Sequence, residues 1–110
     1  MIVLLDPAIE THNTGDDVIS NASHKVLRDL NVDFIALTTR RRWTSAERRL
    51  ARKGCLFILG GTNVLSSSVA TYRQWKFGFL DFLILRKKVV LLGVGWWQYQ
   101  PACDRVTQVL

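Results

Sequence analysis

Short apolar runs alternate with longer, partly polar segments along the whole chain. The runs carry few polar residues and are bounded by turn-forming residues, a pattern typical of strands buried on both faces of a parallel sheet. Four such strands are predicted, at Ile2–Leu5, Val32–Leu37, Cys55–Leu59 and Val89–Leu92. The segments between them are long enough for helices, so the predicted order of elements is βαβαβαβ.

The first intervening segment, Val18–Leu30, has the periodicity of an amphipathic helix. At about 100° per residue its apolar positions share one face. This face is predicted to be buried and consists of Val18, Ile19, Ala22, Val26, Leu27 and Leu30. The opposite face carries Ser20 and His24, which are expected to be solvated.

Two further helices are predicted between the later strands. Thr44 to Glu47 reads as a capping box, and Gly54 is expected to end the short helix that follows. Val69–Leu85 is apolar almost all round, which indicates burial on more than one side or a face left for a partner. Pro101 is a plausible first residue of a fourth helix that reaches Leu110.

This alternation predicts an α/β fold, a Rossmann-like three-layer sandwich with a four-stranded parallel sheet. The 110 residues suffice for one domain, here the whole range 1–110. The strand order 2-1-3-4 is favoured, because it places the turn at Gly60 beside the turn at Gly15. The order 3-2-1-4 is the alternative.

Composition and charge narrow the class of partner. Apolar residues make up 48% of the chain and the net charge is +6, which indicates a packed core and a preference for anionic ligands. Cys55 and Cys103 have no metal-ligand spacing, so no metal and no cofactor are expected. We expect a cytoplasmic protein, since neither a signal peptide nor a transmembrane segment is evident.

A basic cluster lies between Arg40 and Lys53. Its seven Lys and Arg residues suit a solvated outer face, and the alternatives are a membrane surface or an acidic polymer. Basic and aromatic residues also interleave in 72–77, as in some single-stranded nucleic-acid sites. Helical spacing explains those aromatics as core residues, so nucleic-acid binding is disfavoured.

Three loops with glycine follow predicted strands and are therefore expected at one edge of the sheet, where α/β proteins bind ligands. Their candidate ligand-binding residues are Asn13, Thr14, Gly15, Gly60, Gly61, Thr62, Asn63, Gly93, Gly95 and Trp96. The first loop leads into a helix, whose initial N–H groups and dipole favour an anion. Asp16 is either a ligand-binding group or only the helix N-cap.

At these loops the chain resembles the polysaccharide pyruvyl transferase family. The resemblance rests on Asn13-Thr14-Gly15-Asp16-Asp17 with Val18-Ile19, on Phe57-Ile58-Leu59-Gly60-Gly61-Thr62 and on Leu92-Gly93-Val94-Gly95. Members of that family transfer the pyruvyl group of phosphoenolpyruvate to a sugar hydroxyl, usually as a ketal on a surface glycan. The match spans about residues 12 to 98. Thr62 stands where the family usually has a third glycine.

The resemblance implies that this chain is the N-terminal part of a larger enzyme with a second Rossmann-type half. Phosphoenolpyruvate and a sugar or glycan acceptor would then be its partners. His12, Asp16 and Asp17 are the local candidates for proton transfer. The missing half, or another copy, would pair through the helix at 69–85.

Two alternatives to the first half of such a transferase remain open from the sequence. One is a non-catalytic module that binds an anionic ligand or a partner protein. Nucleic-acid binding through the basic cluster is the other, and it predicts a steep loss of affinity with salt.

Overall fold

The computed structural model describes residues 1–61, 76–86 and 89–95. Strands and helices alternate in them as predicted. The elements are β1 (Ile2–Asp6), α1 (Thr14–Asp29), β2 (Phe34–Thr38), α2 (Ser45–Lys53), β3 (Leu56–Gly60), α3 (Phe79–Leu85) and β4 (Val89–Leu92). The helix predicted from Pro101 lies outside the described residues. Within the described part of the chain, no helix is long and apolar enough to cross a membrane.

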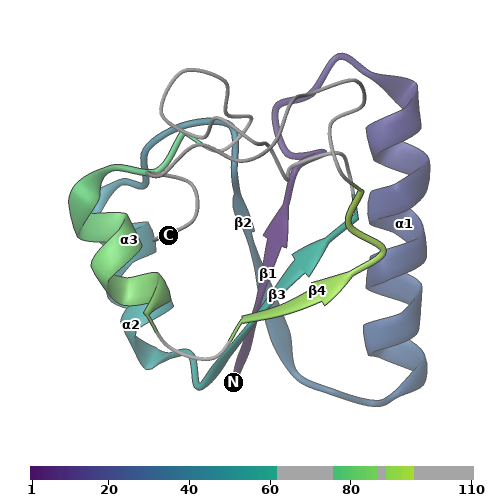
Figure 1. The fold of residues 1–110 in the computed structure, drawn as a ribbon. Coiled ribbons are helices and arrows are strands. Elements are labelled where there is room, and N and C mark those ends of the chain that lie inside the picture. Colours follow the sequence, from purple (N-terminus) through teal and green to yellow (C-terminus); the bar gives the residue numbers. More distant parts are fainter. Residues whose placement is uncertain (62–75, 87–88, 96–110) are drawn as a thin grey trace.

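The four strands form one parallel sheet in the order β2-β1-β3-β4, which confirms the favoured strand order. In the register Leu4 lies between Ala36 of β2 and Ile58 of β3. Figure 1 shows α1 on one face of the sheet and α2 with α3 on the other. The α/β, Rossmann-like arrangement is therefore confirmed.

The larger part of the core lies between the sheet and the pair α2 and α3. Its buried members alternate along the strands, as expected where successive side chains point to opposite faces. They are Val3, Leu5, Leu37, Trp43, Ala51, Phe57, Leu59, Phe77, Ile84 and Leu85. Trp43 is only 2% exposed and packs edge-to-face on Phe77, with ring centroids 5.2 Å apart. Each buried Val, Leu, Ile or Phe side chain contributes about 1.5–3 kcal/mol by leaving water.

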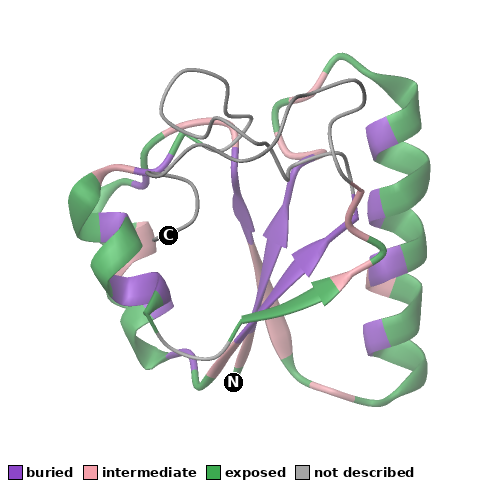
Figure 2. Ribbon diagram, in the orientation of Figure 1, coloured by how far each residue is buried: buried purple, intermediate pink, exposed green. Residues whose placement is uncertain are grey.

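Helix α1 is rotated relative to the prediction. Of the six apolar residues predicted to be buried only Leu27 is buried, whereas Val18 is 65% and Leu30, the C-cap, is 66% exposed. The buried positions are instead Asp16, Ser20, Ser23 and Leu27. Figure 2 shows these buried positions facing the sheet, with most of the remaining helix exposed.

The rotation has a physical cause at the end of β1. The carboxylate of Asp6 is buried there and needs hydrogen-bond donors, which Ser20 and His24 of α1 supply. Ser23 lies against Gly60, where a Cβ would be 3.2 Å from its hydroxyl oxygen. Small and polar residues thus face the sheet, and the prediction that His24 is a solvated surface residue was wrong.

The third helix is shorter than predicted. Residues 76–78 are not helical, and α3 begins only after Gly78, while residues 62–75 lie outside the described part. Glycine is unfavourable inside helices, and the Gly78 N–H donates to Asp81 Oδ2 in the first turn. The outer face of α3 is apolar and exposed at Phe79, Leu80, Phe82 and Leu83.

Candidate functional site at the carboxyl edge of the sheet

The glycine turns after β3 and β4 lie against each other. A Cβ on Gly61 would be 2.4 Å from the carbonyl oxygen of Gly93, and Gly93 itself has a φ of +64°. These glycines therefore permit a close approach of two backbones. The space that was predicted to receive a ligand at Gly61 is partly filled by the neighbouring turn.

The Gly15 turn lies at the same edge but further out. Gly61 approaches Ile19, and Gly60 approaches Ser23, so the tip of β3 meets the second and third turns of α1. At a rise of 1.5 Å per residue, Gly15 lies about 6–12 Å further along the axis of α1 than Ile19 and Ser23, which contact the tip of β3. The turns share one side of the molecule without forming one small pocket.

The N-terminus of α1 is capped by Asn13, not by Asp16. The Asn13 side-chain oxygen accepts the Gly15 N–H at 3.0 Å, and its carbonyl accepts the N–H groups of Asp16 and Asp17 at 3.0 and 3.4 Å. An anion bound to these three amides would have to replace Asn13. Thr14 and Gly15 are exposed beside this cap.

The three candidate proton-transfer residues differ in environment. Asp16 is 5% exposed, forms an ion pair with Arg40 and accepts the Thr11 hydroxyl at 2.9 Å. His12 and Asp17 are exposed. The three side chains therefore differ in accessibility, because Asp16 is held in a buried network whereas His12 and Asp17 are open to solvent. Gly95 is half-buried, and the predicted ligand-binding residues Thr62, Asn63 and Trp96 lie outside the described residues.

Sequence reasoning missed a buried polar group at the tip of β1. Asp6 accepts Ser20 Oγ at 2.7 Å and contacts His24 Nε2 at 2.9 Å through one oxygen, and the Ala8 N–H at 2.8 Å through the other. The His24 ring also packs edge-on against Phe34. An acidic residue at the carboxyl end of a buried strand is the signal that could have indicated it.

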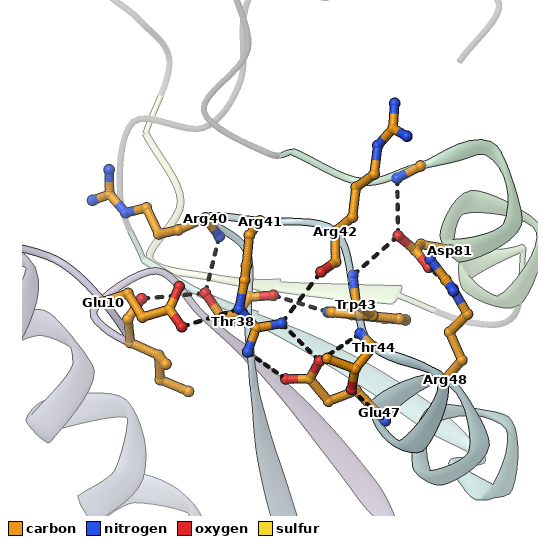
Figure 3. Close-up of polar contacts among 12 residues, drawn as sticks. Glu10, Thr38, Arg40, Arg41, Arg42, Trp43, Thr44, Glu47, Arg48 and Asp81 are labelled. Carbon is orange, nitrogen blue, oxygen red and sulfur yellow. Dashed lines mark hydrogen bonds and ion pairs between the residues drawn. The ribbon is translucent and has the colours of Figure 1, made fainter.

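Much of the basic cluster is neutralised inside the protein. Arg41 bridges the loop after β1 and the start of α2, with bonds of 3.0 Å to Glu10 and of 2.7 and 2.9 Å to Glu47 (Figure 3). Arg40 pairs with Asp16, and Arg48 pairs with Asp81. Among the described residues, at least three of the seven basic residues thus have carboxylate partners, which reduces the charge available to a polyanion or a membrane surface.

The capping box predicted for α2 is present. The Thr44 hydroxyl accepts the Glu47 N–H at 3.2 Å, and Glu47 accepts the Thr44 N–H at 2.7 Å. The bonds from Arg41 and, to a smaller extent, from Thr44 lower the pKa of Glu47 from 4.5 to about 2, against the effect of partial burial. The same carboxylate therefore caps α2 and holds Arg41.

This lowered pKa predicts an acid-dependent loss of stability. The folded pKa of Glu47 is below its unfolded value. The contribution of Glu47 to the free energy of unfolding is therefore complete above about pH 4.5 and is lost as the pH falls to about 2. The urea midpoint of Glu47→Gln should lie below that of the wild type at pH 7, and the two should converge by pH 2. Asp33→Asn, at an exposed position, is the control. A gap that is equal at pH 7 and pH 2 would contradict this assignment.

The close approach of the two glycine turns predicts a cost for any side chain at Gly61. Gly61→Ala must displace the Gly93 backbone and should lower the free energy of unfolding by about 1–3 kcal/mol in urea titration. Gly15→Ala is the matched control, since its Cβ would meet no atom nearer than Asn13 Oδ1 at 3.2 Å. Equal stabilities of the two variants would show that the turns separate easily.

Comparison with known proteins places the chain in a family. The family model of polysaccharide pyruvyl transferase matches residues 13–108, which include the α1 cap and the glycine turns after β3 and β4. Neither the curated proteins nor the solved structures contain a match. On the strength of the family match, which covers most of its length, the chain belongs to the polysaccharide pyruvyl transferase family.

Proposed function

We propose that this chain supplies the N-terminal half-site of an enzyme that transfers a pyruvyl group from phosphoenolpyruvate to a sugar of a surface glycan. The observation that carries the proposal is the family match over residues 13–108, which includes the loops at the carboxyl edge. In α/β folds ligands bind at that edge. The net charge of +6 is also suited to an anionic donor.

The reaction requires a proton transfer at each of its steps. One sugar hydroxyl loses its proton as it adds to carbon 2 of phosphoenolpyruvate, and the methylene carbon takes up a proton. A second hydroxyl then displaces phosphate to close the ketal, and its proton leaves with the phosphate. A base near the hydroxyl and an acid near the methylene are needed. His12 and Asp17 are the exposed candidates in this half, and Asp16 is already bonded to Arg40 and Thr11.

The ion pair between Arg40 and Asp16 favours an anionic donor at this edge. Two acidic residues in the first turn of α1 would repel phosphoenolpyruvate, and Arg40 compensates one of them. Asp17 then remains as the acid closest to the cap that has no ion pair within the described residues. It is suited to a hydrogen bond with a sugar hydroxyl.

Thermal melting of the whole chain tests the proposal. Phosphoenolpyruvate, a sugar nucleotide, inorganic phosphate and buffer are compared, and a ligand at 100 times its dissociation constant stabilises by about 2.7 kcal/mol. Asp17→Asn should increase the shift caused by phosphoenolpyruvate, because it removes a repulsive charge. Asp29→Asn, an exposed acid at the other end of α1, should leave the shift unchanged. The absence of a shift with every ligand would refute the half-site.

A second candidate function is the binding of a partner protein. It is favoured by an apolar groove of about 300 Å³ between α1 and the end of β4, lined by Val18, Ile19, Ala22, Ser23, Val26, Leu92 and Gly93. The exposed face of α3 is a second such surface, part of the 69–85 segment predicted to pair with another half or copy. Sedimentation of the wild type and of Val26→Lys tests this function. A monomer in both cases would argue against self-association through the groove.

A further inference from the structure

The hydroxyl of Thr11 lies at the centre of a polar cluster beside the α1 cap. It accepts the Asn13 N–H at 3.1 Å and Arg40 Nη2 at 3.3 Å, and it donates to Asp16 Oδ2 at 2.9 Å. Since a hydroxyl has one proton and two lone pairs, these three bonds use its full capacity. We call Thr11, Asp16 and Arg40 the Thr11 cluster.

Arg40 joins this cluster to the exit of β1. Its Nε donates to the Pro7 carbonyl at 2.9 Å, while its Nη2 contacts Thr11 and Asp16. The guanidinium therefore bonds both ends of the loop between β1 and α1. A lysine has one compact charge in place of this planar fork and would not make all of these contacts.

The rest of the loop is also held by hydrogen bonds. The Thr38 hydroxyl donates to the Ile9 carbonyl at 3.2 Å, and the Thr11 N–H donates to the Ala8 carbonyl at 3.0 Å. Glu10 has a φ of 66°, which is uncommon for a residue with a Cβ, and its carboxylate pairs with Arg41 (Figure 3). Such a conformation persists only where the surroundings enforce it.

His12 lies between two residues of this bonded segment. Thr11 precedes it with its hydroxyl fully bonded, and Asn13 follows it as the helix cap. The bonds of these two neighbours fix the backbone of His12. Its side chain is exposed, so the ring faces solvent. A fixed backbone limits the positions that an accessible titratable ring can take, which is one requirement of a proton-transfer group.

We propose that the Thr11 cluster is a set of positioning residues that fixes His12 toward the sugar hydroxyl. This inference rests on the proposed function. It assigns to Asp16 a role different from proton transfer, because its carboxylate holds Thr11 and Arg40. It also explains why an arginine that follows β2 is bonded to the loop that follows β1.

Substitutions at Thr11 test the positioning without dependence on catalysis. The chain has only two histidines, so the Cε1–H signals of His12 and His24 are readily assigned by NMR. Thr11→Val removes the hydroxyl at constant shape, and the order parameter of the His12 amide should fall from about 0.85 to below about 0.6. Thr11→Ser should preserve the wild-type value, and Thr14→Val, at an exposed position, is the control. Equal His12 order in Thr11→Val and Thr14→Val would overturn the proposal.

A ligand titration separates this inference from the proposed function. Thermal melting with phosphoenolpyruvate and a sugar nucleotide reports binding, and the chemical shift of His12 Cε1–H reports the contact. In the wild type and Thr11→Ser both should change. In Thr11→Val the thermal shift should remain while the His12 signal no longer moves. No thermal shift in the wild type would refute the half-site alone, whereas an equal His12 response in Thr11→Val would refute the positioning.

Discussion

Asp6→Ala is expected to lower the free energy of unfolding by about 3 kcal/mol, measured by urea titration at pH 7. The substitution leaves the hydroxyl of Ser20, a residue 8% exposed, and the Ala8 N–H without their acceptor, and it removes the partner of His24. A buried donor that loses its partner carries the full cost of its desolvation. Because the same bonds orient α1 on the sheet, the His24 ring should also move away from Phe34.

Asp33→Ala provides the matched control for Asp6. It removes an exposed carboxylate just before β2, so its effect should stay within about 0.5 kcal/mol. Asp6→Asn keeps the size of the side chain, and its loss in the free energy of unfolding should lie between those of Asp6→Ala and Asp33→Ala. A loss for Asp6→Ala no larger than that for Asp33→Ala would mean that α1 is held by Leu27 and its apolar neighbours alone.

Asp81→Ala is expected to have the largest effect, about 3–5 kcal/mol. Asp81 is fully buried and accepts Arg48 Nε at 2.6 Å, the Gly78 N–H at 2.9 Å and the Trp43 N–H at 3.3 Å (Figure 3). It therefore links α3, α2 and the segment that follows β2. Its removal leaves a mostly buried guanidinium and two N–H groups without an acceptor. Urea titration at pH 7 measures the loss.

Two further variants identify which bonds of Asp81 matter. Asp29→Ala removes an exposed carboxylate that pairs with Lys25 on the surface of α1, and it should cost less than about 0.5 kcal/mol. Arg48→Met combined with Asp81→Ala should recover part of the loss, because no unpaired charge remains. If Asp81→Ala alone is as stable as Asp29→Ala, the buried network does not hold α3 in place.

Most of the architecture could be predicted from local pattern. Apolar runs predicted four strands, and the observed strands differ only at their ends, for instance by including Asp6 and Gly60. The reciprocal bonds of Thr44 and Glu47 were predicted correctly because a capping box is contained within four consecutive residues. The favoured strand order was confirmed. It was predictable because parallel strands with short connections allow few arrangements.

The candidate site was predictable only in part. The loops at Gly15, Gly61 and Gly93 do lie at one edge, because every strand of a parallel sheet ends there. The roles of Asp16 and His24 were not predictable, since they depend on Arg40 and Asp6, which are 24 and 18 positions away in the chain. The functional roles of all the candidate site residues stay predictions, and residues 62–63 and 96 also lie outside the described part of the chain.

The sequence by itself therefore determined the elements, their order and the edge at which they present their polar loops, because these follow from periodicity and local capping. Only the tertiary structure decided which face of α1 is buried and which charges of the basic cluster are neutralised. Hydrophobic periodicity favoured the face with Val18 and Val26, but the buried carboxylate of Asp6 has to be hydrogen-bonded, and the residues that bond it lie on another face. Long-range pairing of polar groups leaves no periodic signal in the chain.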